Sequence, residues 1–272
     1  MKNKRSWVSY LVLVLVFAVV CFPVYYGIIG SFMGTADINS FPSALWPVHG
    51  FELGNYASAL SAIPLARQYL NSVIVSLGVT AGQLITSVLA AYALVFLPMK
   101  GRNIWFGGIL VTMMIPWEAV ILPNYMTMYR MGLLDTLIAL MLPFLAAGFG
   151  VFLLRQAFLG FPKELQEAAR IDGCGNFRFL LSILVPIMRP NLAALAIWSF
   201  LSAWNMFFWP LLVTNKSANQ TIQIGITMLQ NAENANPGLV LAGVVLAIIP
   251  TLLLVIFGQR FIVKGLTAGA IK

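Results

Sequence analysis

The chain has 272 residues, of which 60% are hydrophobic and only 9% are charged, whereas an ordinary soluble domain carries roughly a quarter charged residues. This composition excludes an ordinary soluble domain and is typical of a membrane protein. The formal net charge of +8 is divided among short segments between long apolar runs. Because the basic residues do not gather on one polar face, the charge argues against nucleic acid binding.

Six long apolar runs predict transmembrane helices, because lipid offers no hydrogen-bond partner to an unpaired backbone. A transmembrane barrel would instead show short segments of alternating polarity. Phe22-Pro23-Val24 lacks a small-residue cleavage site, so we expect the first run to remain as a span. The chain is therefore predicted to be an all-α integral membrane protein with one transmembrane domain over residues 1–272. The six runs lie at residues 8–32, 69–98, 104–128, 137–159, 191–214 and 239–258.

The basic residues predict the orientation of these spans. If both termini lie on one side, 13 of the 16 Lys and Arg residues fall on that side, and only Arg67, Arg130 and Lys216 fall on the other. Since cytoplasmic loops carry an excess of basic residues, both termini are predicted to face the cytoplasm. Residues 160–190 then form a long inner loop, and residues 215–238 form an outer loop.

Neither a metal site nor a nucleotide site is indicated by the sequence. His49 is the only histidine, and no cluster of Cys, His and carboxylate residues has ligand spacing. No Gly-x-x-x-x-Gly-Lys-Ser/Thr phosphate loop occurs in the chain. Cys21 and Cys174 lie in different environments, and we expect two free thiols. We therefore expect no cofactor and no enzymatic activity in this chain itself.

The inner loop predicts two short helices joined by a sharp turn. Residues 163–171 are good helix formers, and Pro162 suits the first turn of a helix. Gly173 is a natural left-handed C-cap. A second helix is expected over residues 176–184, until Pro186 interrupts it.

This loop resembles the signature loop of ABC importer permeases, in which Glu-Ala-Ala, three residues, Gly and nine residues lead to Ile-x-Leu-Pro. Here Val185 replaces the Leu that precedes Pro186. In the family the loop forms a coupling helix docked on an ATPase, and the resemblance implies a type I importer permease fold and the same use here. A solvated connector is the alternative interpretation. The residues expected to contact the ATPase are Glu167, Ala168, Ala169, Arg170, Asp172 and Gly173.

Further pieces are similar to the carbohydrate-importer branch of these permeases, the maltose and glycerol-phosphate type. They imply a second homologous permease, a dimeric ATPase that holds ATP and Mg, and an extracytoplasmic solute-binding protein. They also imply that the chain lies in the bacterial cytoplasmic (inner) membrane, in contact with membrane lipid. The matching residues are Asn71-Ser72, Ile115-Pro116, Pro123, Tyr125, Gly132-Leu133, Ala203-Trp204-Asn205, Trp209-Pro210-Leu211, Gly265-Leu266 and Gly269-Ala270.

Polar and aromatic residues within the spans are candidates for the solute pathway. Glu118 is costly in a span unless it is paired or hydrated, and Pro116 and Pro123 beside it are expected to break or kink the helix. Trp204 with Asn205 offers an aromatic face and an amide, as sugars favour. Helix packing is the alternative for all of them. The candidates are Glu118, Tyr125, Trp204, Asn205 and Gln83.

The second outer loop is rich in amides and almost free of charge. In maltose-type permeases the corresponding segment reaches toward the solute-binding protein, which implies a similar contact here. An ordinary hydrated loop is the alternative interpretation. The candidate contacts are Asn219, Gln220, Gln223 and Asn231.

Together these features predict a permease subunit of an ATP-driven, binding-protein-dependent importer for a sugar, an oligosaccharide or a sugar-phosphate. The alternative is a secondary transporter that couples an ion gradient through Glu118. One lone intramembrane acid is a poor relay, and the spans show no evident inverted repeat.

Overall fold

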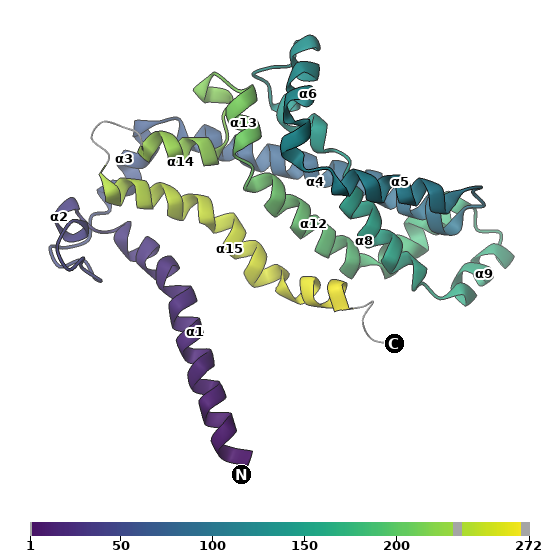
Figure 1. Cartoon of the computed structure of the whole chain (residues 1–272), viewed down its shortest axis with the longest axis horizontal. Helices are drawn as coiled ribbons and strands as arrows, with labels where there is room; N and C mark the ends of the chain where they lie inside the picture. Colours follow the sequence, from purple (N-terminus) through teal and green to yellow (C-terminus); the bar gives the residue numbers. More distant parts are fainter. Residues whose placement is uncertain (1, 231–235, 268–272) are drawn as a thin grey trace. The chain divides into compact units, whose positions relative to one another are not determined.

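The computed structural model is helical throughout the residues that it describes, which are 2–230 and 236–267. Its internal contacts define two compact units. Unit 1 consists of Met1–Gln68 and Ile222–Ile249, and unit 2 of Tyr69–Thr221 and Pro250–Lys272. Figure 1 shows the helices in chain order. Two long helices, α4 (Leu65–Phe96) and α15 (Pro237–Thr267), run from one unit into the other.

Three spans are continuous helices. The apolar stretches Trp7–Gly30 in α1 (Lys2–Gly30), Leu65–Phe96 in α4 and Pro237–Gln259 in α15 are each long enough to cross a bilayer. At about 1.5 Å per residue, each exceeds the roughly 30 Å hydrocarbon core. The apolar 18-residue window of the α1 stretch contains no residue that is buried within the chain.

The other three spans are bent pairs of helices. α5 (Arg102–Met114) and α6 (Trp117–Arg130) meet at 95°, and α8 (Gly148–Leu159) bends by 46° from the helical segment Leu137–Phe144 before it. Asn176–Ile187 meets α12 (Arg189–Trp204) at 80°. Counting each bent pair as one span gives the six predicted spans.

Proline explains the sharpest of these bends. Pro116 has no N–H to continue the ladder of α5, and Ile115 before it takes an extended conformation with φ −80° and ψ 117°. The predicted break at Pro116 is therefore confirmed. Pro123 lies inside α6.

The fifth span differs from its predicted bounds of 191–214. α12 ends at Trp204, and a separate helix α13 (Phe208–Val213) follows. At this end the Leu201 carbonyl accepts both the Asn205 N–H at 3.1 Å and the Asn205 side-chain amide at 2.8 Å. The span instead begins earlier, at Asn176, because residues 176–187 are helical across Pro186.

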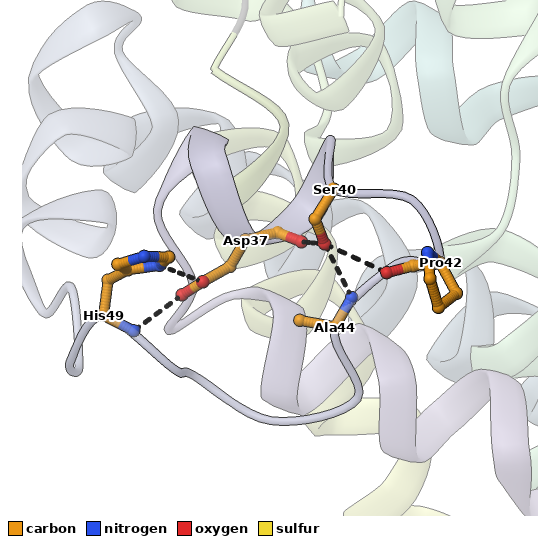
Figure 2. A network of polar contacts seen from close by, with 5 residues as sticks. All are labelled: Asp37, Ser40, Pro42, Ala44 and His49. Carbon is orange, nitrogen blue, oxygen red and sulfur yellow. Dashed lines mark hydrogen bonds and ion pairs between the residues drawn. The ribbon is translucent and has the colours of Figure 1, made fainter.

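Unit 1 contains α1, the short helices α2 (Thr35–Ile38) and α3 (Gly54–Ala62), and α14 (Ile222–Gln230). A polar network holds the segment between α2 and α3 (Figure 2). Asp37 pairs with the His49 ring and accepts a bond from the His49 N–H at 3.3 Å. The Ser40 hydroxyl donates to the Asp37 carbonyl at 2.7 Å and accepts from the Ala44 N–H at 3.1 Å. The segment between α2 and α3 is therefore held by specific polar contacts.

Unit 2 also contains α7 (Leu137–Met141), the 3-10 turn η1 (Leu142–Phe144), α9 (Lys163–Ile171), α10 (Asn176–Phe179) and α11 (Val185–Ile187). A π-helical turn, Leu180–Leu184, joins α10 to α11, and a 3-10 turn η3 (Ser217–Asn219) follows α13. One buried cluster packs aromatic rings from α4, α8, α10 and the segment before α9. Its rings are those of Tyr92, Phe96, Phe158, Phe161 and Phe179.

Polar side chains on α4 bind the carbonyl groups of irregular segments in unit 2. Gln83 donates to the Phe144 carbonyl at 2.9 Å, and Thr86 donates to the Leu145 carbonyl at 3.0 Å, so both bind the bend between η1 and α8. Asn71 donates to the Ala218 and Gln220 carbonyls, each at 2.9 Å. Tyr92 donates to the carbonyl of Asn176 at 3.0 Å. The bonds from Gln83 and Thr86 supply partners to backbone groups at the break before α8.

Small residues on α4 allow the same bend to approach closely. A Cβ atom added at Gly78 would lie 2.3 Å from the Met141 Sδ. One added at Gly82 would lie 2.6 Å from Leu145 Cδ2 and 3.1 Å from Leu145 Cα. Gly78 and Gly82 therefore allow close packing between α4 and the segment before α8.

We predict that Gly82→Val destabilises the protein by about 1–3 kcal/mol, because the added atoms collide with backbone that cannot yield as a flexible side chain does. The measurement is the midpoint of thermal unfolding in detergent. Gly107→Val is the control, because a Cβ at Gly107 meets nothing within 4 Å. Equal midpoints for the two variants would contradict this account of the packing.

Candidate functional site

The helix α9 and the turn after it have the form that the sequence predicts. α9 covers Lys163–Ile171, with Pro162 as its N-cap residue. Gly173 has φ 71°, in the left-handed region that favours glycine. The Asp172 N–H donates to the Ala168 carbonyl at 3.0 Å and the Cys174 N–H to the Ala169 carbonyl at 2.9 Å, which closes the helix end. α9 stands at one end of unit 2 (Figure 1).

One side of α9 is fixed to the core through Ala169. This residue is 5% exposed and belongs to the cluster that includes Phe96, Phe158 and Phe179. The expectation that Ala169 lies open to a partner therefore does not hold for this residue within the chain. Its small side chain instead lets α9 approach the aromatic rings closely. Ala168 is exposed, so the two neighbouring alanines lie on different faces of α9.

The opposite side of α9 is an exposed surface of mixed character. Ile171 follows Glu167 by four residues and Ala168 by three, and all three are exposed, with Ile171 exposed to 86%. Arg170, Asp172 and Gly173 are exposed beside them. In the described part of the chain, ion pairs form only at Asp37 and Asp135, so the charges of α9 have none. We call this set, Glu167, Ala168, Arg170, Ile171, Asp172 and Gly173, the α9 surface.

The prediction from sequence omitted Ile171. Its signal was available, because an apolar residue four positions after Glu167 shares the polar face of the helix. A large apolar side chain so fully exposed in such a place is typical of a protein contact.

A second feature of unit 2 is a cavity of about 350 Å³ beside the bend between η1 and α8. Its wall combines tryptophan and phenylalanine rings with an amide and a hydroxyl. The lining residues are Val79, Gln83, Trp117, Pro143, Phe144, Ala146, Ala147, Trp198, Ser202, Ala203 and Met206.

Ring contacts and hydrogen bonds fix the cavity wall. The Trp117 and Phe144 rings lie 4.5 Å apart between centroids, and the Trp198 ring lies 4.3 Å from that of Phe149. Gln83 donates to the Phe144 carbonyl and accepts from the Ser199 hydroxyl at 2.6 Å. An amide has two donor hydrogens and two acceptor positions, so each of these atoms keeps a further position.

The structure separates the predicted pathway residues. Gln83 lines the cavity, whereas Trp204 is fully buried outside it and packs on Tyr69 with centroids 5.3 Å apart. Asn205 is exposed at the end of α12. Tyr125 packs partly buried against the cluster that contains Trp209.

Glu118 is exposed in the first turn of α6, next to the cavity residue Trp117. A helix N-terminus stabilises a carboxylate by about 0.3–1 kcal/mol, so this position lowers the cost of the charge. The chemistry-bearing residues Trp117, Trp198 and Ser202 were missing from the prediction, because the bends that bring them together are not visible as a sequence motif.

Comparison with known proteins shows the family to which this chain belongs. The family described as "Binding-protein-dependent transport system inner membrane component" matches residues 82–267, which is more than half of the chain. The chain belongs to this family. It is therefore a multi-pass inner-membrane permease, a transport subunit without catalytic activity of its own, and ATP is handled by a partner subunit.

Two relatives show how far the similarity extends. The sn-glycerol-3-phosphate transport system permease protein UgpE of Agrobacterium fabrum is 40% identical over 269 residues, covering 95% of each chain. The arabinooligosaccharides transport system permease protein AraQ of Halalkalibacterium halodurans is 41% identical over 202 residues, covering 74% of this permease and 72% of that one.

The fold is also similar to that of a solved structure. A chain from the crystal structure of a bacterial ABC transporter involved in the import of the acidic polysaccharide alginate matches with a TM-score of 0.86. The match covers 95% of this permease and 96% of that chain, at 23% sequence identity. The predicted all-α permease fold is confirmed.

The loop at residues 215–238, predicted to lie outside, uses several of its polar groups within the chain. Asn219 donates to the Asp135 carbonyl at 2.7 Å, and Gln220 is buried with its carbonyl bound by Asn71. Gln223 is half-buried in α14. Asn231 lies outside the described residues. Contact of these residues with a binding protein stays a prediction.

Asp135 organises the start of this loop. Its carboxylate accepts hydrogen bonds from the N–H groups of Asn215 at 3.2 Å and Lys216 at 3.1 Å, and the Lys216 ammonium lies 3.7 Å away. Burial raises the pKa of the Asp135 carboxyl. The N–H donors, Asn219 and the Lys216 charge outweigh burial and hold that pKa below its usual value.

We predict that this loop loses stability when Asp135 is protonated. A carboxyl whose pKa is lowered by folding stabilises the folded state above its unfolded pKa of about 3.9 and loses that effect as the pH falls through the folded pKa. The wild-type unfolding midpoint should therefore drop more between pH 6 and acidic pH than that of Asp135→Asn. Identical pH profiles would contradict the role of this carboxylate.

Proposed function

We propose that this permease forms half of the translocation pathway of an ATP-driven, binding-protein-dependent importer for a sugar, an oligosaccharide or a sugar-phosphate. It pairs with a second, homologous permease. A dimeric ATPase docks on the α9 surface, and an extracytoplasmic solute-binding protein delivers the solute. The permeases UgpE and AraQ, named for sn-glycerol-3-phosphate and arabinooligosaccharide transport, support this range of solutes.

The same proposal places both termini and α9 in the cytoplasm. Its support is the division of basic residues, 13 of 16 on the side of the termini. α9 follows the fourth span, so it lies on that side as well.

The observation that carries the coupling role is the two-sided packing of α9. Ala169 fixes the helix in the aromatic cluster, while Ile171 and the charges of the α9 surface face away from it. When ATP closes the ATPase dimer, a partner that holds the exposed side pulls on α9. Because Ala169 packs with Phe96 of α4 and Phe158 of α8, the movement passes directly to two spans.

The cavity supports a role in solute passage. Sugars present apolar CH faces, which pack on Trp117 and Trp198, and hydroxyls, which bond to Gln83 and Ser202. No Lys or Arg is among its lining residues, so a phosphate group passing here takes its cation from the partner permease. This half of the pathway therefore suits the neutral part of a solute.

The competing function, an ion-coupled secondary transporter, gains no support from Glu118. Its side chain is exposed at a helix N-terminus and does not line the cavity, whereas a proton relay needs a chain of buried titratable groups. Membership of the binding-protein-dependent family favours ATP coupling.

Solute-stimulated ATP hydrolysis by the reconstituted complex tests the coupling role. We predict that Glu167→Lys lowers the stimulation about five- to tenfold, because it reverses a charge on the α9 surface. Gly173→Val should do the same by straining the turn, whereas Gly173→Asn should retain most of it, because Asn tolerates positive φ.

Glu52→Lys provides the control, since it makes the same charge change in the exposed segment before α3. Assembly of each complex is verified first by size-exclusion chromatography. Normal stimulation in both Glu167→Lys and Gly173→Val would show that the loop is only a connector.

Solute uptake into proteoliposomes at saturating loaded binding protein tests the cavity. We predict that Trp198→Leu lowers the uptake rate about two- to tenfold, the effect of losing an aromatic stacking surface. Trp105→Leu is the matched control, because Trp105 is exposed on α5 and does not line the cavity. Equal rates for the two variants would remove Trp198 from the pathway.

A further inference from the structure

A groove of about 370 Å³ lies between α4 and the fifth span in unit 2. Its lining is entirely apolar, and several members are exposed, among them Ile85 at 60% and Phe177 at 68%. Open apolar surface of this kind needs an occupant. The lining residues are Leu84, Ile85, Val88, Leu89, Phe177, Leu180, Leu181, Val185 and Leu192.

The groove has the depth of one leaflet. Leu84 and Leu89 precede the end of α4 at Phe96 by 12 and 7 residues, or about 18 and 10 Å along the helix axis. Half of the hydrocarbon core is about 15 Å thick. Phe177, on the other wall, comes four residues after the Gly173 turn of the inner loop. The groove therefore opens into the leaflet on the side of α9.

Two arginines stand beside the groove without partners in the described part of the chain. Arg178 precedes the lining residue Leu181 by three positions, and Arg189 precedes Leu192 by three, so each cation neighbours the groove wall on its helix. Both are exposed, and neither takes part in an ion pair among the described residues. Arg189 also stands in the first turn of α12, where the helix dipole favours an anion and disfavours an unpaired cation.

We propose that this groove binds an anionic phospholipid, with an acyl chain along the apolar wall and the headgroup phosphate on Arg178 and Arg189. Basic pockets between spans on the cytoplasmic side suit such headgroups. A helix of a partner permease fits less well, because its positive-inside ends would bring further cations to the two arginines. The proposal rests on the orientation given above only for the choice of the cytoplasmic leaflet.

The test is lipid retention by the complete transporter. The complex is purified from bilayers of equal phosphatidylglycerol and phosphatidylcholine, and the lipids that remain bound are counted by native mass spectrometry. The wild type should retain phosphatidylglycerol in preference. Arg178→Gln and Arg189→Gln should each lower that preference about fivefold.

Two further variants distinguish binding of the lipid acyl chain from binding of the lipid headgroup. Leu89→Trp fills the groove without changing the charge, so it should reduce the retained phosphatidylglycerol even if an arginine variant fails to assemble. Arg102→Gln is the control, because Arg102 is exposed on the same side of the membrane and does not adjoin the groove lining in sequence.

An absence of preference in the wild type, or a loss as large in Arg102→Gln as in the groove variants, would overturn the proposal. Retention that falls in Leu89→Trp but stays normal in both arginine variants would overturn the headgroup assignment. The assay contains no ATP, so failure of the coupling role leaves its result unchanged. Solute-stimulated ATP hydrolysis, measured separately in the same samples, tests the coupling role.

Discussion

The need of every backbone N–H and C=O group for a partner within the bilayer is the constraint on which the structure of this permease depends. Three helix pairs, each counted as one span, are bent, and each bend leaves backbone groups outside the helical ladder. α4 meets this need at one bend, because Gln83 and Thr86 donate to the Phe144 and Leu145 carbonyls between η1 and α8. These two buried or half-buried polar residues of α4 therefore support the bend before α8.

The bend between η1 and α8 connects this constraint with the cavity. Gly82 lets the bend approach α4, and Gln83 binds its carbonyl while lining the cavity. If one continuous helix replaced this bend, the contact between the Phe144 and Trp117 rings, whose centroids lie 4.5 Å apart, would be lost. Gln83 thus has two roles, because its side chain forms hydrogen bonds between helices and also lines the cavity.

Rigid packing relates the helix α9 to the spans. The rings around Ala169 come from α4, α8 and α10, and aromatic pairs of this kind contribute about 0.5–1.5 kcal/mol each beyond their buried area. A helix fixed in this way moves with its cluster instead of bending away from it. The groove with Arg178 and Arg189 begins only a few residues beyond the Gly173 turn, so the lipid proposed there borders the segment proposed to couple to the ATPase.

The sequence by itself determined the bend at Pro116, the bounds of α9 and the turn at Gly173, because proline and glycine act locally. It also predicted six spans from hydrophobic length. It also predicted the family through the Glu-Ala-Ala loop. Only the tertiary structure decided that Ala169 faces the core and Ile171 faces outward, that the fifth span ends at Trp204, and that Trp117 and Trp198 share a cavity with Gln83. Those features depend on contacts between residues far apart in the chain, and helical periodicity does not specify which neighbour a face meets.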